Sequence, residues 1–228
     1  MGRIGRIWFC GYRDWALSLY AHACSHTGAS ISLIKDGKDF AKRKSEFDKD
    51  DLFLFIGWSW ILPKEIVDKY TCVCLHPSPL PKYRGGSPLQ HQIIKGETDS
   101  AATFFLMNEH LDKGPILYTE SFSLDGSLSE IYDRIVKCGR NGIDSLIGQF
   151  LAGTPLIGEP QDESAKTYYK RRTPSMSEIK IEEVSEMTAM QIYNKVRALQ
   201  DPYPNAYIRC KDDTILLLKT VAVGEEIT

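Results

Sequence analysis

The chain has 228 residues, of which 43% are hydrophobic and 25% are charged, and this is enough to bury a core in one medium domain with a small addition. A formal net charge of −2 and a pI near 6.2 give no general attraction for nucleic acid. There is no run of 18 apolar residues and no signal peptide at the N-terminus. We therefore expect a cytoplasmic protein that binds neither nucleic acid nor membrane, and a homodimer is left open.

Cysteine usage also argues for the cytoplasm. Most of the six cysteines lie inside apolar segments, which favours reduced thiols over disulfides in a chain with no secretion signal. Cys72 and Cys74 are separated by one residue, which is not the usual zinc spacing, and no second pair of ligands is visible. We therefore expect no metal.

The first half of the chain alternates apolar runs with helical segments. Strands are expected at residues 4–10, 30–34, 51–57 and 70–75, and helices at 15–24 and 63–69. A further helix is expected to start with Ser87 as its N-terminal cap and Pro88 in its first turn. Gly28 is expected to end the first helix, and residues 35–50 form a loop with a short helix. The continuous run at 51–57 suits a central parallel strand that is buried on both faces. A lone Gly11 in place of the Gly-x-Gly-x-x-Gly pattern makes a dinucleotide cofactor a poor fit.

The second half reads as a hairpin, a long helix and a small terminal unit. Strands are expected at residues 101–107 and 115–124 with Asp112 in the turn, and Ser127 and Glu130 form a capping box for a helix that ends near Leu151. Residues 153–175 read as a surface linker, followed by a helix at 187–199 and a hairpin of residues 206–210 and 214–223. We predict an α/β fold with a mostly parallel, Rossmann-like sheet at 1–155, and a linker with a small α+β annex at 156–228.

Two motifs concentrate reactive side chains at tight turns. Residues 76–86 read HPSPLPKYRGG directly after the strand at 70–75, and residues 111–116 read LDKGPI. His76 thus stands at the carboxyl end of a strand, the edge of an open α/β sheet at which ligands bind. Asp112 follows His76 by 36 residues, and the predicted hairpin brings it near the same strand end.

This pair of motifs resembles the signature of the folate-dependent formyltransferases, which include glycinamide ribonucleotide, methionyl-tRNA and nucleotide-sugar formyltransferases. The resemblance is close over residues 50–125, and residues 201–206, DPYPNA, are similar to the start of the accessory region in the sugar enzymes. It implies the formyltransferase fold, 10-formyltetrahydrofolate as co-substrate and a nucleotide-linked amino sugar as acceptor, in polysaccharide biosynthesis. One position departs from the pattern, because Cys74 stands where the family has a catalytic Asn.

The resemblance gives His76, Asp112 and Cys74 catalytic roles in a non-covalent acyl transfer. Imidazole exchanges protons near neutral pH, so His76 suits removal of the proton from the attacking amine, and Asp112 orients the ring. An Asn amide would donate to the developing oxyanion, whereas a thiol is a weak donor. Strand alternation places Cys74 and His76 on one face, so a covalent Cys-His-Asp site, as in a thiol hydrolase, stays open.

The resemblance also assigns binding residues. Trp58, Trp60 and Leu62 match the segment that lines the pterin pocket, and His110 and Leu111 flank it from the second motif. Alternatively, both tryptophans are core residues, because Trp is highly buried on average. Ser78, Lys82, Tyr83 and Arg84 are expected to bind the acceptor, with Lys and Arg beside a glycine turn suited to a diphosphate; solvated loop charges are the alternative.

Other functions remain open at this stage. The Cys74 substitution allows a catalytically weak protein that binds folate or a nucleotide sugar. A methionyl-tRNA or purine-pathway formyltransferase is the other alternative within the family.

Overall fold

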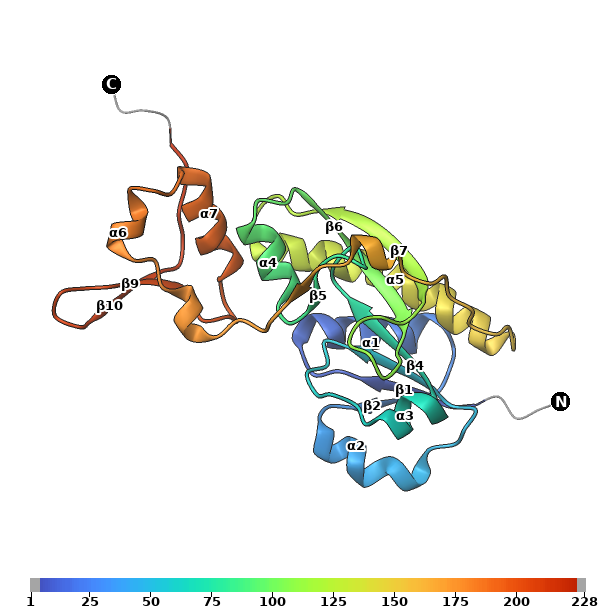
Figure 1. Ribbon diagram of the computed structural model, residues 1–228. Helices are drawn as coiled ribbons and strands as arrows, with labels where there is room; N and C mark the ends of the chain where they lie inside the picture. Colours follow the sequence, from blue (N-terminus) through green and yellow to red (C-terminus); the bar gives the residue numbers. More distant parts are fainter. Residues whose placement is uncertain (1–4, 225–228) are drawn as a thin grey trace.

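A six-stranded mixed sheet forms the centre of the computed structural model, which describes residues 5–224 (Figure 1). Its strand order is β2-β1-β3-β4-β6-β7. The strands are β1 (Ile7–Cys10), β2 (Ile31–Ile34), β3 (Leu52–Ile56), β4 (Thr71–His76), β6 (Asp99–Leu106) and β7 (Ile116–Ser123). The first four run parallel, and β6 and β7 pair antiparallel beside β4. The predicted α/β fold with a mostly parallel sheet is confirmed.

Helices cover both faces of this sheet. On one face α1 (Asp14–His26) and α5 (Leu128–Leu151) share a core with the apolar side chains of β1, β3 and β4. On the other face α2 (Gly37–Arg43) and α3 (Lys64–Lys69) contribute Phe40 and Ile66 to a second core. All five residues of β3 are buried, as predicted for a strand between two layers of helices.

Local signals account for most of the element boundaries. Ser127 and Glu130 form the predicted capping box of α5, and Gly28 follows α1 with a φ of 65°, a left-handed conformation that glycine adopts readily. The predicted first strand began at residue 4, which lies outside the described residues. The prediction for Ser87 is wrong: it precedes α4 (Pro88–Ile94) but makes no cap, because its hydroxyl oxygen instead accepts the Arg172 backbone N–H at 3.2 Å.

Residues 153–175 do more than link two parts of the chain. In β8 (Tyr168–Tyr169) they pair in parallel with β5 (Arg84–Gly85), near the end of the His76 motif, and a short 3-10 turn (Glu163–Ala165) precedes this pairing. The two backbones come so close that a Cβ at Gly86 would overlap the backbone of Arg171. The segment therefore packs against the loops that carry the motifs, which corrects the surface linker expected from its polar composition.

The C-terminal annex is a small α+β unit beside α4 (Figure 1). It contains a 3-10 turn (Pro174–Ser177), α6 (Ile181–Val184), α7 (Ala189–Ala198), β9 (Ala206–Arg209) and β10 (Ile215–Leu218), and the last two form the predicted hairpin. Its buried side chains, among them Val196 and Leu199, belong to the same core as α1 and α5. Arg197 also donates to the carbonyl oxygens of Leu124 and Gly126 at 2.6 and 3.1 Å.

All six cysteines are free thiols. Among the helices of residues 5–224, none is long and apolar enough to cross a membrane. Over the same residues, no three His, Cys, Asp or Glu side chains gather as metal ligands would.

Candidate functional site

A cavity of about 670 Å³ opens at the edge of the sheet where β1, β3 and β4 end. Its walls include Arg13 after β1, Gly57 and Trp58 after β3, and Cys74 and His76 at the end of β4. This volume lies within the usual range for small-molecule sites. The carboxyl edge of the parallel strands therefore holds the ligand site that the topology favours.

His76 is buried at the end of β4, and its two ring nitrogens have different partners. Nε2 lies 2.9 Å from the carbonyl oxygen of Tyr83, and Nδ1 lies 3.8 Å from Oδ2 of Asp112. A carbonyl oxygen only accepts, so Nε2 carries the ring proton and donates it in this hydrogen bond. Nδ1 is the nitrogen that faces the Asp112 carboxylate.

Asp112 is held in an unusual backbone conformation at the turn between β6 and β7. Its φ is 52°, in the left-handed region, and its Oδ2 accepts the Gly85 backbone N–H at 2.7 Å. Left-handed residues other than glycine persist where the surroundings enforce them, often at functional sites. The carboxylate is thereby fixed beside His76, as expected from the hairpin.

Gln161 joins the two motif loops from residues 153–175. Its Nε2 donates to the carbonyl oxygens of Asp112 and Gly114 at 3.0 and 2.8 Å. Its Oε1 accepts from Nε and Nη2 of Arg84 at 3.1 and 2.7 Å. One buried amide thus connects the backbone of the Asp112 turn to the loop that follows His76.

Arg84 is occupied by protein partners. Besides Gln161, its guanidinium contacts Glu163 at 2.8 Å, and this hydrogen bond lowers the pKa of Glu163 to about 2. The guanidinium is buried and does not line the cavity. The predicted phosphate contact is therefore corrected, because the Arg84 charge is neutralised inside the protein.

The other three predicted acceptor residues also lie off the cavity wall. Ser78 is buried and donates to the Lys82 carbonyl oxygen, and the Tyr83 hydroxyl donates to Glu97. The Lys82 side chain is exposed. Ser78 and Tyr83 thus shape the His76 loop instead of lining the cavity, whereas the contact of Lys82 with the acceptor stays a prediction.

Cys74 borders the cavity next to His76. Burial raises the pKa of its thiol well above the ordinary value, and the nearby Asp112 charge raises it further. Because the thiolate is the nucleophilic form of cysteine, this environment opposes a covalent Cys-His-Asp mechanism.

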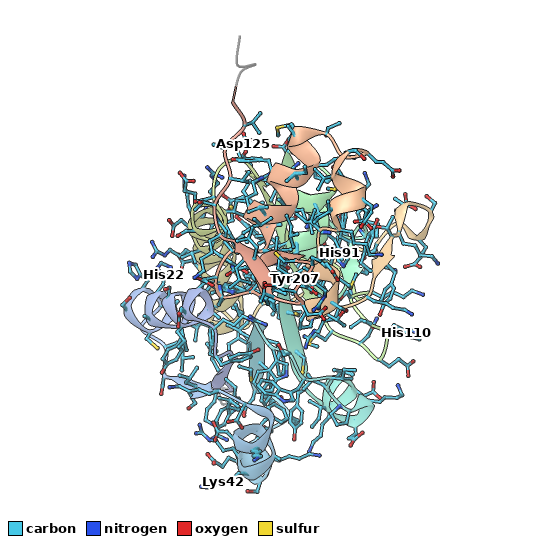
Figure 2. All side chains as sticks on the ribbon, turned by 90° about the vertical axis from the view of Figure 1, so that its left-hand side faces the viewer. His22, Lys42, His91, His110, Asp125 and Tyr207 are labelled. Atoms are coloured by element: carbon cyan, nitrogen blue, oxygen red, sulfur yellow. The ribbon has the colours of Figure 1, made fainter. Side chains whose placement is uncertain are left out.

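An aromatic wall forms another side of the cavity. All five residues predicted to contact folate line it: Trp58, Trp60, Leu62, His110 and Leu111. The Trp58 and Trp60 rings lie 4.7 Å apart, and Trp60 is 43% exposed, so it is not a core residue. Trp58 also packs against the second core, as the alternative interpretation held. His110 lies on a loop at the outer edge of the molecule (Figure 2).

Several lining residues were not found from the sequence. They come from segments far apart in the chain and include Arg13, Trp15, Gln90, Tyr132, Tyr168, Arg171 and Tyr203. Arg171 belongs to a basic run that is visible in the sequence, but nothing in that run indicates which motif it packs against. Tyr203 follows α7, so the annex contributes to the wall.

Comparison with known proteins identifies relatives of both parts of the chain. The family described as Formyl transferase matches residues 22–146, and the family described as Formyl transferase, C-terminal domain, matches residues 183–227. A methionyl-tRNA formyltransferase of Rickettsia bellii is 33% identical over 180 residues, which are 77% of this chain and 57% of that protein. The chain thus spans less than two thirds of the length of this curated relative.

Solved structures share the fold. A methionyl-tRNA formyltransferase from Clostridium thermocellum is 26% identical with a TM-score of 0.74, covering 93% of this chain and 96% of that one. A sugar N-formyltransferase from a Shewanella species is 17% identical with a TM-score of 0.76, covering 98% of this chain and 100% of that one.

Proposed function

Because this chain belongs to the formyl transferase family, we propose that it moves a formyl group from 10-formyltetrahydrofolate to the primary amine of a nucleotide-linked amino sugar. The observation that carries the proposal is the pairing of His76 with Asp112, 3.8 Å apart, at the wall of a cavity of about 670 Å³. Proximity of two bound reactants supplies much of the rate enhancement in such transfers.

His76 removes the proton from the attacking amine. Its Nδ1 takes the proton, since Nε2 is committed to the Tyr83 carbonyl oxygen, and Asp112 stabilises the resulting imidazolium. The Gly85 N–H and Gln161 keep Asp112 in place. Proton transfer by a positioned side chain of this kind contributes about 10²–10⁴-fold in rate.

The aromatic wall suits the pterin ring of the formyl donor. It offers flat apolar surface, and the buried indole N–H of Trp58 has no hydrogen-bond partner within residues 5–224, as expected where a ligand supplies the acceptor atom. When bound, the donor provides the formyl carbon and a leaving nitrogen. Cys74 borders the reacting centre at the position of the family Asn, and its neutral thiol is a weak donor to the formyl oxygen.

Two acceptors need to be compared. The net charge of −2 gives no general attraction for nucleic acid, which favours the sugar nucleotide. The 33% identity to a methionyl-tRNA formyltransferase favours the aminoacyl end of a tRNA as the second candidate.

Formyl transfer from 10-formyltetrahydrofolate tests the proposal directly. The acceptors are UDP-, dTDP- and GDP-linked amino sugars and methionyl-tRNA, and the formylated product is detected by mass spectrometry. We expect turnover of an amino sugar that falls about 10²–10⁴-fold in His76→Asn. His26→Asn is the matched control, because His26 is exposed and does not line the cavity.

Each alternative gives a distinct result. Turnover of methionyl-tRNA alone supports the second acceptor. Binding of folate without transfer to any acceptor supports the weak binding protein. Equal activity of His76→Asn and wild type contradicts the assigned proton transfer.

A further inference from the structure

Buried polar atoms without a partner are concentrated at the cavity. Within residues 5–224, six buried side-chain nitrogen or oxygen atoms have no hydrogen-bond partner, and three of them belong to cavity residues: Trp15 Nε1, Trp58 Nε1 and Gln90 Nε2. A buried donor left unpaired destabilises the folded protein, because it has lost its hydrogen bonds to water without gaining others. Such atoms are rare in folded proteins, so their concentration at one cavity points to a ligand that forms hydrogen bonds with them.

Trp15 and Gln90 form a cluster distinct from the aromatic wall. Trp15 lies in the first turn of α1 and stacks on Tyr132 of α5, with ring centroids 6.0 Å apart. Gln90 in α4 is 2% exposed, and its amide nitrogen approaches the Tyr132 hydroxyl without meeting hydrogen-bond geometry. That hydroxyl is paired instead with the hydroxyl of Tyr203 at 2.6 Å.

The chemistry of this cluster selects ligand atoms that accept hydrogen bonds. The unpaired groups of Trp15 and Gln90 are both N–H donors, and Arg13 beside them adds a positive charge. The two carboxylates among the lining residues are engaged elsewhere, since Glu109 pairs with Lys64 and Asp112 faces His76. Hydroxyl and phosphate oxygens are the matching groups.

The geometry points to Gln90 and Trp15 as the residues that bind the acceptor, donating hydrogen bonds to hydroxyl oxygens of its sugar ring while Arg13 faces its phosphate. This inference rests on the proposed function and names the half of the cavity that the acceptor occupies. The terminal torsion of a glutamine is broad, so a rotation of the Gln90 amide turns its donor toward the ligand. The aromatic wall of Trp58 and Trp60 is left for the pterin.

Removing an unpaired donor should weaken binding of the acceptor without lowering the melting temperature of the free protein. In Gln90→Leu the free protein loses a group that it does not satisfy, so we expect the melting temperature to stay level or rise. The KM for the amino-sugar nucleotide rises about tenfold or more, because a bond worth 1.4 kcal/mol is a factor of ten. The KM for 10-formyltetrahydrofolate stays unchanged. Trp15→Phe keeps the ring, removes the donor and gives the same split between the two KM values.

Gln92→Leu is the matched control on the same helix. Gln92 is equally buried, and its Oε1 is also one of the six atoms without a partner, but its Nε2 donates to the carbonyl oxygens of Pro77 and Pro88 at 2.9 and 3.1 Å. We expect this variant to melt at a lower temperature than wild type, in contrast to Gln90→Leu. A fall in the melting temperature of Gln90→Leu equal to that of Gln92→Leu would mean that the Gln90 amide is bonded internally and would overturn the inference.

Binding measurements separate this inference from the proposed function. Calorimetry with the UDP-, dTDP- and GDP-linked amino sugars, without folate, reports acceptor binding even if no formyl transfer occurs. Affinity that falls about tenfold or more in both variants supports the inference whether or not the protein is an active transferase. Unchanged affinity in both variants, no binding by wild type, or a change in the folate KM alone overturns it.

Discussion

Cys74 is the residue that most distinguishes this site. Its neighbours His76 and Asp112 have the arrangement that acyl transfer needs, whereas a neutral thiol stands where an amide donor is expected from the family pattern. An oxyanion donor typically contributes about 10²–10³ in rate, so in the proposed mechanism the identity of this side chain governs the rate of transfer.

Cys74→Asn is expected to raise kcat, by up to about 10²-fold, because an amide N–H is a stronger donor than a thiol. Steady-state formyl transfer measures the change, and Cys74→Ala, which supplies neither donor, is the control. We expect Cys74→Ala to remain active. Complete loss of activity in Cys74→Ala would instead indicate a nucleophilic thiol.

At this scale the sequence predicts residues that lie in motifs better than it predicts the partners of charged side chains. His76 and Asp112 lie in the two motifs and come together at the cavity, as predicted. Arg84 also lies in a motif, yet it turns inward to Gln161, which is 77 residues away. No local pattern encodes a partner at that distance.

Gln161 and Glu163 make the segment before β8 a brace for the catalytic loops. The amide of Gln161 joins the Asp112 turn to Arg84, and the Glu163 carboxylate neutralises the same guanidinium. The composition of this segment is polar, which accounts for its interpretation as a linker, but the side chains of Gln161 and Glu163 bind the two motif loops. A segment that supports other loops differs from a linker in the residues that its side chains contact, and those contacts are set by the fold.

Gln161→Leu is expected to lower the free energy of unfolding by about 1–3 kcal/mol, because the buried Arg84 guanidinium and two carbonyl oxygens lose their partner. A shift of the Asp112 turn by an ångström reduces kcat by up to about 10²-fold. Chemical denaturation and steady-state kinetics measure the two effects. Gln149→Leu on the outside of α5 is the control, and unchanged kcat in Gln161→Leu would show that the brace does not position Asp112.

The Glu163 carboxylate gives the brace a defined response to acid. Its pKa falls from 4.5 to about 2 in the folded protein, chiefly through the Arg84 hydrogen bond, so the unfolded chain binds this proton first. The stabilisation is present above pH 4.5 and is lost as the pH falls toward 2. We expect the difference in melting temperature between wild type and Glu163→Gln to be constant above pH 5 and to shrink at lower pH. A difference independent of pH would contradict the ion pair.

The stability contributed by Cys72 in β4 has the opposite dependence on pH, because it is lost in base. Burial raises the pKa of Cys72 from 9.0 to about 12, so the folded protein holds a proton that the unfolded chain releases. The stabilisation is complete below pH 9.0 and declines as the pH rises toward 12. Cys72→Ala, which cannot ionise, is expected to lose less stability than wild type between pH 8 and pH 11 in thermal melts. Parallel losses in the two proteins would contradict this assignment.

Across the whole molecule, the annex and the sheet domain share one core. Leu199 and Val196 pack in the same cluster as α1 and α5, and Arg197 bonds to the backbone after β7. Helix spacing in the sequence predicts α7 and its apolar face, but the surface that this face covers is known only from the fold. The division at residue 155 therefore describes the order of the chain, while packing joins the two parts.

Leu199→Ala is expected to destabilise the entire chain by about 2–5 kcal/mol, since Leu199 is buried in the shared core. Tryptophan fluorescence, which reports the sheet domain, and hydrogen exchange of β9, which reports the annex, should shift together. Leu217→Ala is the control, because Leu217 is exposed on the hairpin. Separate transitions from the two probes would show that the annex unfolds independently.

The residues around the cavity are also synthesised at different times. A ribosome produces His76 and Asp112 first, but Arg171 and Tyr203 reach the same cavity from positions up to 91 residues beyond Asp112. At about 5–20 residues per second, roughly 5–20 s separate the synthesis of the reacting pair from that of the last wall residue. A nascent chain therefore carries the His76–Asp112 pair well before Arg171 and Tyr203 complete the cavity wall.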